Sequence, residues 1–126
     1  MPSQNNSGLQ HQKDDAITLI ATAVLLPNRI IGYGGAHATS AGGANDAQGV
    51  SETGAAIGDA VSVVTEYSYL VECSGAIALY DYIKPAADGS GRAAVGLITD
   101  HCGRALGATT TAGQLFEMQI VRHVHP

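Results

Sequence analysis

The stretch Gly113-Gln114-Leu115-Phe116-Glu117-Met118 decides the fold class, because it joins a turn glycine to a strand pattern. In an extended chain Phe116 and Met118 fall on one face, whereas Glu117 and Gln119 fall on the other. A glycine supplies the positive φ that a chain needs where a turn leads into a strand. The pattern therefore predicts a half-buried strand that starts at a glycine turn.

Two other stretches repeat this rhythm. Gly58-Asp59-Ala60-Val61-Ser62-Val63 also opens with a glycine and a polar residue, and then continues as a strand pattern. Leu79-Tyr80-Asp81-Tyr82-Ile83-Lys84 follows the same pattern, with Tyr80 where the glycine would stand. Three similar ladders favour a small barrel over a scaffold with a deep cleft.

Outward from these stretches, the sequence predicts short strands separated by turns. The strands are expected at Ile17–Val24, Arg29–Tyr33, Gly49–Glu52, Ala60–Thr65, Tyr67–Cys73, Tyr80–Pro85, Ala93–Thr99 and Leu115–Val124. The segment Asp100–Leu106 is compatible with a single helical turn. Short strands at such spacing are typical of all-β proteins, so we expect a small barrel or sandwich of antiparallel strands.

The chain of 126 residues has the length of one domain. Residues 1–15 are polar and are expected to form a flexible N-terminal arm. Residues 16–126 are expected to form a single β-barrel domain. Within it, residues 34–48 predict a long loop rich in glycine and alanine.

Charge and apolar content exclude several classes of protein. The net charge is −5 and the six Lys and Arg residues are scattered, so nucleic-acid binding is not expected. The longest apolar run, Ala16–Leu26, is too short for a membrane helix and has no basic lead-in of a signal peptide. Two cysteines are too few for a disulfide framework and fit a protein made in the cytoplasm.

The histidines are the best candidates for a metal site. His123 and His125 fall on one strand face, and His101 or Cys102 could complete a tetrahedral set. A single His-x-His pair is weak, so we predict no metal and no cofactor. His101 and Cys102 are neighbours on opposite strand faces and so do not form a dyad by adjacency. We therefore expect no catalytic residue and no enzyme, and a metal-dependent enzyme remains the third hypothesis.

Apolar strand surfaces are the best candidates for a functional site. Tyr67 and Tyr69 share a strand face, and tyrosine is favoured at interfaces. The strand that carries Ile17 and Leu19 is apolar on both faces. Since few charges are available for ion pairs, we expect a homo-oligomer held by apolar surfaces, with these four residues as its interface candidates. Composition allows a dimer and a trimer equally.

The order of turns and strands resembles a known family. The stretches that carry the resemblance are Gly49–Glu52, Gly58–Val63, Leu70–Ile77, Ala87–Ala93, Gly103–Thr109 and Gly113–Met118. Together they resemble the small capsid decoration, or cement, proteins of tailed bacteriophages. The chain departs from the family pattern at Tyr80, which replaces a glycine, and in the length of the loop at 34–48.

The resemblance implies a structural virion protein without enzymatic activity. Such proteins are compact β-barrels on the exterior of an expanded capsid, often trimers on local three-fold axes, that bridge major capsid protein subunits. The chain would then be made in the host bacterial cytoplasm and would have the major capsid protein and copies of itself as partners. The alternative is a small β-barrel module that binds a ligand or a carbohydrate. Such a module needs aromatic side chains at its site, and the chain has one Phe and no Trp.

Overall fold

The computed structural model describes residues 13–41 and 47–121, with side chains from residue 15 onward. These residues form eight β-strands and no α-helix, which confirms the predicted all-β class. Accordingly, this part of the chain contains no helix that could cross a membrane. The strands are β1 (Lys13–Ile20), β2 (Ile30–Gly32), β3 (Ala47–Ser51), β4 (Ala60–Glu72), β5 (Tyr82–Pro85), β6 (Ala93–Val95), β7 (Gly103–Ala105) and β8 (Leu115–Ile120).

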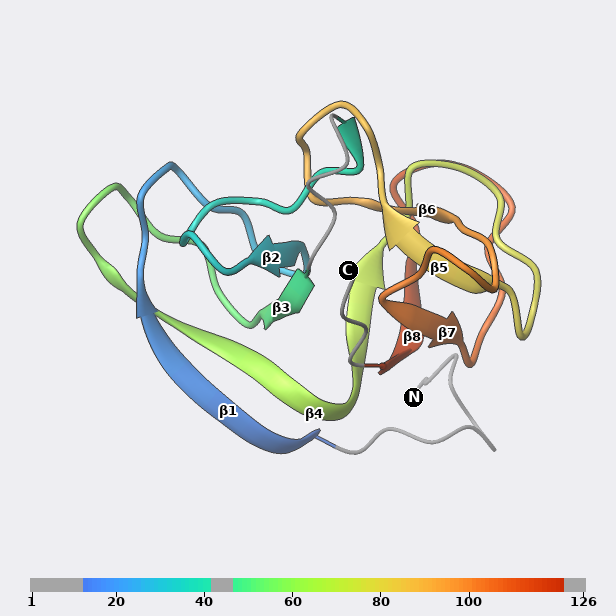
Figure 1. The fold of residues 1–126 in the computed structure, drawn as a ribbon, viewed down its shortest axis with the longest axis horizontal. Helices are drawn as coiled ribbons and strands as arrows, with labels where there is room; N and C mark the ends of the chain where they lie inside the picture. The colour runs from blue at the N-terminus through green and yellow to red at the C-terminus, as the bar shows by residue number, and fades with distance from the viewer. Residues whose placement is uncertain (1–12, 42–46, 122–126) are drawn as a thin grey trace.

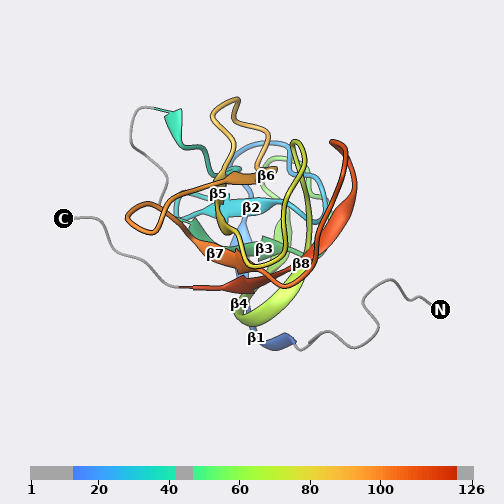
Figure 2. The ribbon, with the colours of Figure 1, turned by 90° about the vertical axis from the view of Figure 1, so that its right-hand side faces the viewer.

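The strands form one antiparallel sheet that nearly closes into a barrel. Its order is β2-β3-β4-β8-β7-β5-β6, and β1 pairs with β4 in addition. β4 is the longest of the described strands; it starts at the left of the molecule, runs along its lower side and bends upward to end near the middle (Figure 1). Seen from the side, β5, β6, β7 and β8 lie in front of β1, β2 and β3 (Figure 2).

Several predicted elements differ from the observed ones. β1 starts at Lys13, within the segment assigned to the arm, and residues 1–12 lie outside the described part of the chain. The helical turn expected at Asp100–Leu106 is wrong, because Gly103–Ala105 forms β7 and pairs with β5 and β8. Ala93–Val95 is a shorter strand than predicted. Of the loop expected at 34–48, residues 47–48 belong to β3 and residues 42–46 lie outside the description.

The two strands predicted at 60–65 and 67–73 are one bent strand. β4 pairs with β1 and β3 up to Tyr67 and with β8 from Ser68 onward. Tyr67 lies at the change of partner and has a φ of 67°, which is unusual for a tyrosine. The sequence shows strand-forming residues on both sides of Tyr67, but nothing in it indicates that the two segments form one continuous strand.

Glu117 also departs from its prediction. Its side of β8 was expected to face solvent, but Glu117 is only 1% exposed and the Ser68 hydroxyl donates to its Oε2 at 2.5 Å. A buried carboxylate needs such donors, because removal from water disfavours its charge. Phe116 and Met118 pack in the core as expected.

Four turns of the chain share one backbone shape. At the same point of each, the φ angle is positive: Asn28 (59°), Gly58 (91°), Tyr80 (72°) and Gly113 (90°). The rhythm predicted from Gly58, Tyr80 and Gly113 is therefore confirmed, and Tyr80 takes the conformation that a glycine would take. The turn at Asn28 is a fourth copy, which the sequence pattern does not mark because no glycine stands at the positive-φ position.

These four turns form two pairs with the same hydrogen bonds. Leu25 and Ala55 exchange backbone bonds of 2.8 and 3.0 Å, and Ile77 and Thr109 exchange bonds of 3.2 and 2.9 Å. Four further pairs of bonds correspond: Ala21 N to Asp59 O with Cys73 N to Gln114 O, Gly58 N to Ala21 O with Gly113 N to Cys73 O, Asn28 N to Ser51 O with Tyr80 N to Ala105 O, and Ser51 N to Arg29 O with Ala105 N to Asp81 O.

The molecule therefore consists of two similar halves. The first half, residues 13–65, holds β1, β2, β3 and the start of β4, and the second half, residues 66–121, holds the rest of the strands (left and right in Figure 1). β1 corresponds to the end of β4, β2 to β5, β3 to β7, and the start of β4 to β8, with the same antiparallel pairings.

Each half has its own hydrophobic core, built from corresponding residues. The core of the first half contains Ala21, Leu25, Ile31, Val61 and Val63, and the core of the second half contains their counterparts Cys73, Ile77, Ile83, Phe116 and Met118. Three first-half residues, Ile30, Ala38 and Val50, also pack into the second-half core. Consecutive β2 residues thus point into different cores, as strand geometry requires.

Candidate interaction surfaces

The four predicted interface residues lie on two adjacent strands. Ile17 and Leu19 of β1 are half-buried and pack against the core of the first half. Tyr69 of β4 is half-buried against the core of the second half, and corresponds to Ile17. Tyr67 is half-buried at the bend of β4. Each of these side chains is therefore partly buried within its own chain. Their role in contacts between chains stays a prediction.

Larger exposed apolar side chains lie elsewhere, in turns and at the ends of strands. On the first half they are Ile20, Val24, Leu26, Tyr33 and Ile57, and on the second half Leu79, Tyr80, Val95, Leu97, Ile98 and Leu115. Sequence reasoning missed them because it searched strand faces. The available signal was the presence of Ile, Leu and Tyr inside turns, where polar residues are usual.

The junction between the halves is polar. The Asn28 amide donates from Nδ2 to Leu70 O at 2.9 Å, and Asn28 O accepts the Glu72 N–H at 2.9 Å. The Glu72 carboxylate lies 3.3 Å from Arg29 Nη2 and 2.9 Å from Arg92 Nε. Because Arg29 is buried, it needs the negative charge of the Glu72 carboxylate as a partner, and this ion pair connects the first half to the second.

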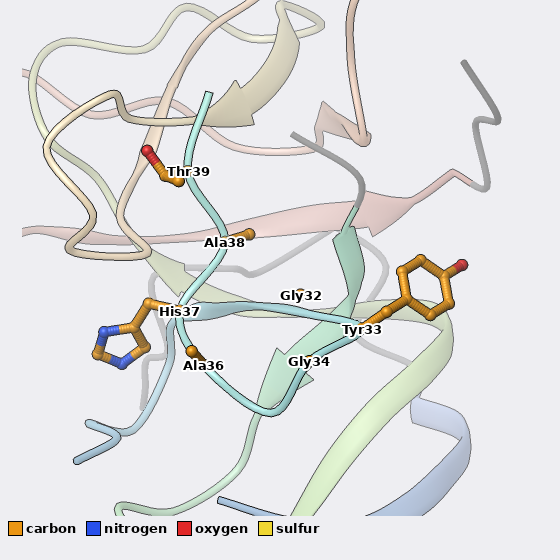
Figure 3. A pocket seen from close by; sticks show the side chains of 7 residues that line it. All are labelled: Gly32, Tyr33, Gly34, Ala36, His37, Ala38 and Thr39. Atoms are coloured by element: carbon orange, nitrogen blue, oxygen red, sulfur yellow. The ribbon is translucent and has the colours of Figure 1, made fainter. Parts of the chain in front are cut away.

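A shallow pocket of about 380 Å³ surrounds the hairpin after β2. Its lining is mostly glycine and alanine, and the side chains of Tyr33 and His37 point in opposite directions (Figure 3). His37 Nε2 accepts the Leu26 N–H at 3.1 Å, while burial and the nearby Arg29 charge lower the pKa of His37. The pocket therefore offers one aromatic ring and no converging polar groups to a ligand.

The surroundings of His101 and Cys102 do not favour a metal site or a reactive thiol. The centroid of the His101 ring lies 4.8 Å from that of the Tyr82 ring, and the Arg104 guanidinium carbon lies 4.3 Å from the centroid of the same tyrosine ring. Burial raises the pKa of Cys102 to about 12, so its thiol stays protonated and is a poor nucleophile. Within residues 13–41 and 47–121 no three His, Cys, Asp or Glu side chains gather as a metal site, and His123 and His125 lie outside these ranges.

The fold is similar to that of a solved phage protein. The structure resembles the N-terminal base of the head fiber gp8.5 of bacteriophage phi29, with a TM-score of 0.62 and 16% sequence identity. The similarity covers 88% of this chain and 98% of that one. No protein-family model and no curated protein sequence matches the chain. At this identity the likeness establishes a shared fold.

Proposed function

We propose that this chain is a structural protein of a phage virion, which binds the exterior of the capsid and bridges major capsid subunits. The observation that carries the proposal is the similarity to the phi29 head fiber base, because it spans nearly all of that chain. The order of turns and strands supports it independently through its resemblance to capsid decoration proteins.

The distribution of apolar side chains also supports this role. A protein that bridges subunits needs contact surfaces on more than one side, and exposed apolar residues lie in the turns of both halves. The low content of Lys and Arg argues for contacts with protein rather than with the packaged DNA. The proposed partners are the major capsid protein and further copies of the chain, with a trimer favoured and a dimer possible.

The proposed role requires neither catalysis nor a cofactor. The chain would be made in the cytoplasm of the bacterial host and would join the capsid there. The pocket beside Tyr33 and His37 is a weak basis for the alternative of a carbohydrate-binding module, since its side chains diverge.

Binding to capsids tests the proposal directly. Expanded capsids of the encoding phage, prepared without this protein, are mixed with the purified chain and sedimented, with unassembled major capsid protein as the control. We expect saturable co-sedimentation with assembled capsids and added density on their outer surface in electron cryo-microscopy. Absence of binding would overturn the proposal, and binding to a glycan array instead would favour the carbohydrate-binding alternative.

A further inference from the structure

We infer that copies of this chain associate head to tail, with the second half of one copy docking on the first half of the next. The contact would reproduce the junction that joins the two halves within one chain. This inference rests on the internal repeat and does not depend on the proposed role at the capsid.

The internal junction has a simple geometry. The turn at Asn28 lies along the outer edge of the second part of β4, where it binds the backbone of Leu70 and Glu72 at 2.9 Å each. Beside it, the Ile30 N–H donates to Gly91 O at 2.7 Å. A turn of the first half thus covers the edge of the first strand of the second half.

The turn of the second half and the strand edge of the first half that correspond to this junction make no such contact among the described residues. Tyr80 corresponds to Asn28 and is 63% exposed. The strand that corresponds to the covered edge is β1, which pairs only with β4 within residues 13–41 and 47–121. Ala21 donates its N–H to Asp59, so the N–H of the preceding residue, Ile20, points to the other, open edge of β1.

The residues at these open positions are apolar, as an interface between separate chains requires. Where the internal junction has polar residues, the open ends have large exposed apolar ones: Ile20 for Glu72, Tyr80 for Asn28, Leu97 for Thr39 and Ile98 for Ser40. The exposed fractions of these four side chains run from 58% to 68%. Separate copies lose entropy when they associate, whereas the two halves of one chain are already joined covalently. Burial of these apolar side chains between copies would supply the free energy that offsets this loss.

Positions that are exposed in both halves mark the surface outside this contact. Val24 and its counterpart Ala76 are both exposed, which distinguishes Val24 from Ile20 although both are apolar and lie close in sequence. A head-to-tail contact joins two different surfaces, so repetition of it forms a closed ring or an open filament. A ring of three copies would agree with the trimer proposed above.

Crosslinking between two engineered cysteines tests the pairing of different surfaces. Thr18 corresponds to Leu70 and faces Tyr80 of the next copy in this arrangement, while the native Cys73 and Cys102 are buried and stay unreactive. We expect a short bis-maleimide to join Thr18→Cys to Tyr80→Cys when the two variants are mixed, and to join neither variant to itself. Self-crosslinking of either variant, or no crosslink in the mixture, would overturn the inference.

Substitutions at matched positions test the contact itself. Sedimentation velocity should show association weakened at least about tenfold by Ile20→Asp and unchanged by Val24→Asp, because burying an unpaired carboxylate is costly. Far-UV circular dichroism checks folding, and Tyr80→Asp serves if Ile20→Asp does not fold. A monomeric wild-type chain, or equal effects of the Ile20 and Val24 substitutions, would contradict the inference. Capsid binding by a monomeric wild type would leave the proposed function standing alone, and association without capsid binding would leave this inference standing alone.

Discussion

Asn28 and Tyr80 hold a left-handed backbone that most side chains avoid. For a residue other than glycine this conformation costs about 1–2 kcal/mol, although asparagine tolerates it better than tyrosine. The turns keep it because the N–H of each residue donates to a neighbouring strand of the same chain at 2.9 Å, Asn28 to Ser51 O in β3 and Tyr80 to Ala105 O in β7. A bulky residue retained at such a place and left exposed fits a contact role for Tyr80.

The two glycines at the equivalent positions should be difficult to replace. Gly58→Ala and Gly113→Ala should each lower the free energy of unfolding by about 1–2 kcal/mol, because alanine disfavours positive φ. A Cβ would meet no atom within 4 Å at either position, so the loss would come from the backbone alone. Urea denaturation measures it, with Gly75→Ala as the control, since Gly75 has the same open space without a positive φ. An equal loss in all three variants would contradict this explanation.

His37 should make stability depend on pH. Its pKa in the folded chain is lowered from the ordinary value of 6.5, so the unfolded chain takes up the proton first as the pH falls. The wild type should therefore be most stable, relative to His37→Gln, above about pH 6.5 and should lose that advantage as the pH falls toward the pKa of the folded state. Urea midpoints of both proteins between about pH 5 and pH 8 measure it. A difference that stays constant over this range would show that His37 does not titrate as described.

At the scale of the strands, close backbone contact fixes the register of each half. Gly49 in β3 and Gly103 in β7 occupy corresponding positions, each one residue before the register partner of Val64 or Gln119. A Cβ at Gly49 would overlap Val64 O, and a Cβ at Gly103 would lie 2.6 Å from Gln119 O. Both positions of close backbone contact, Gly49 and Gly103, therefore require glycine, even though the halves share few residues in sequence.

Alanine at Gly49 or Gly103 should push β3 away from β4, or β7 away from β8. Gly49→Ala and Gly103→Ala should each destabilise the chain by about 2 kcal/mol or more, because the clash is with backbone that cannot move alone. Thermal unfolding followed by circular dichroism measures the loss. Gly34→Ala is the matched control, because a Cβ there would meet nothing within 4 Å. Wild-type stability of both the Gly49 and the Gly103 variant would show that the strands adjust freely.

The strands could be predicted from local patterns, but their partners could not. Turn glycines and alternating side chains located most strands, and three of the four equivalent turns were visible because they share a rhythm at Gly58, Tyr80 and Gly113. The fourth turn, at Asn28, and the short strand at Gly103–Ala105 have no such pattern, since their conformations depend on hydrogen bonds to distant segments. The exposed apolar residues of the turns were also missed, because exposure depends on how the turns pack in three dimensions.

At the scale of the whole molecule, β4 joins the two halves covalently and by packing. It is the last strand of the first half and the first strand of the second. Ile30 and Val50 of the first half pack in the core of the second, and Glu72 holds Arg29 across the junction. Neither half buries these side chains without the other.

The two halves should therefore unfold as one unit. Val50→Ala removes contacts in a core that contains residues from both halves, and should lower the urea midpoint for both to the same extent, at a loss of about 1–3 kcal/mol. Far-UV circular dichroism and the reactivity of Cys73 and Cys102 of the second half follow the transition with independent probes. Coincident curves are expected in the wild type and in the variant. If thiol exposure in Val50→Ala occurred at the wild-type urea concentration while the circular dichroism midpoint fell, the halves would be separate folding units and the shared β4 would act only as a tether.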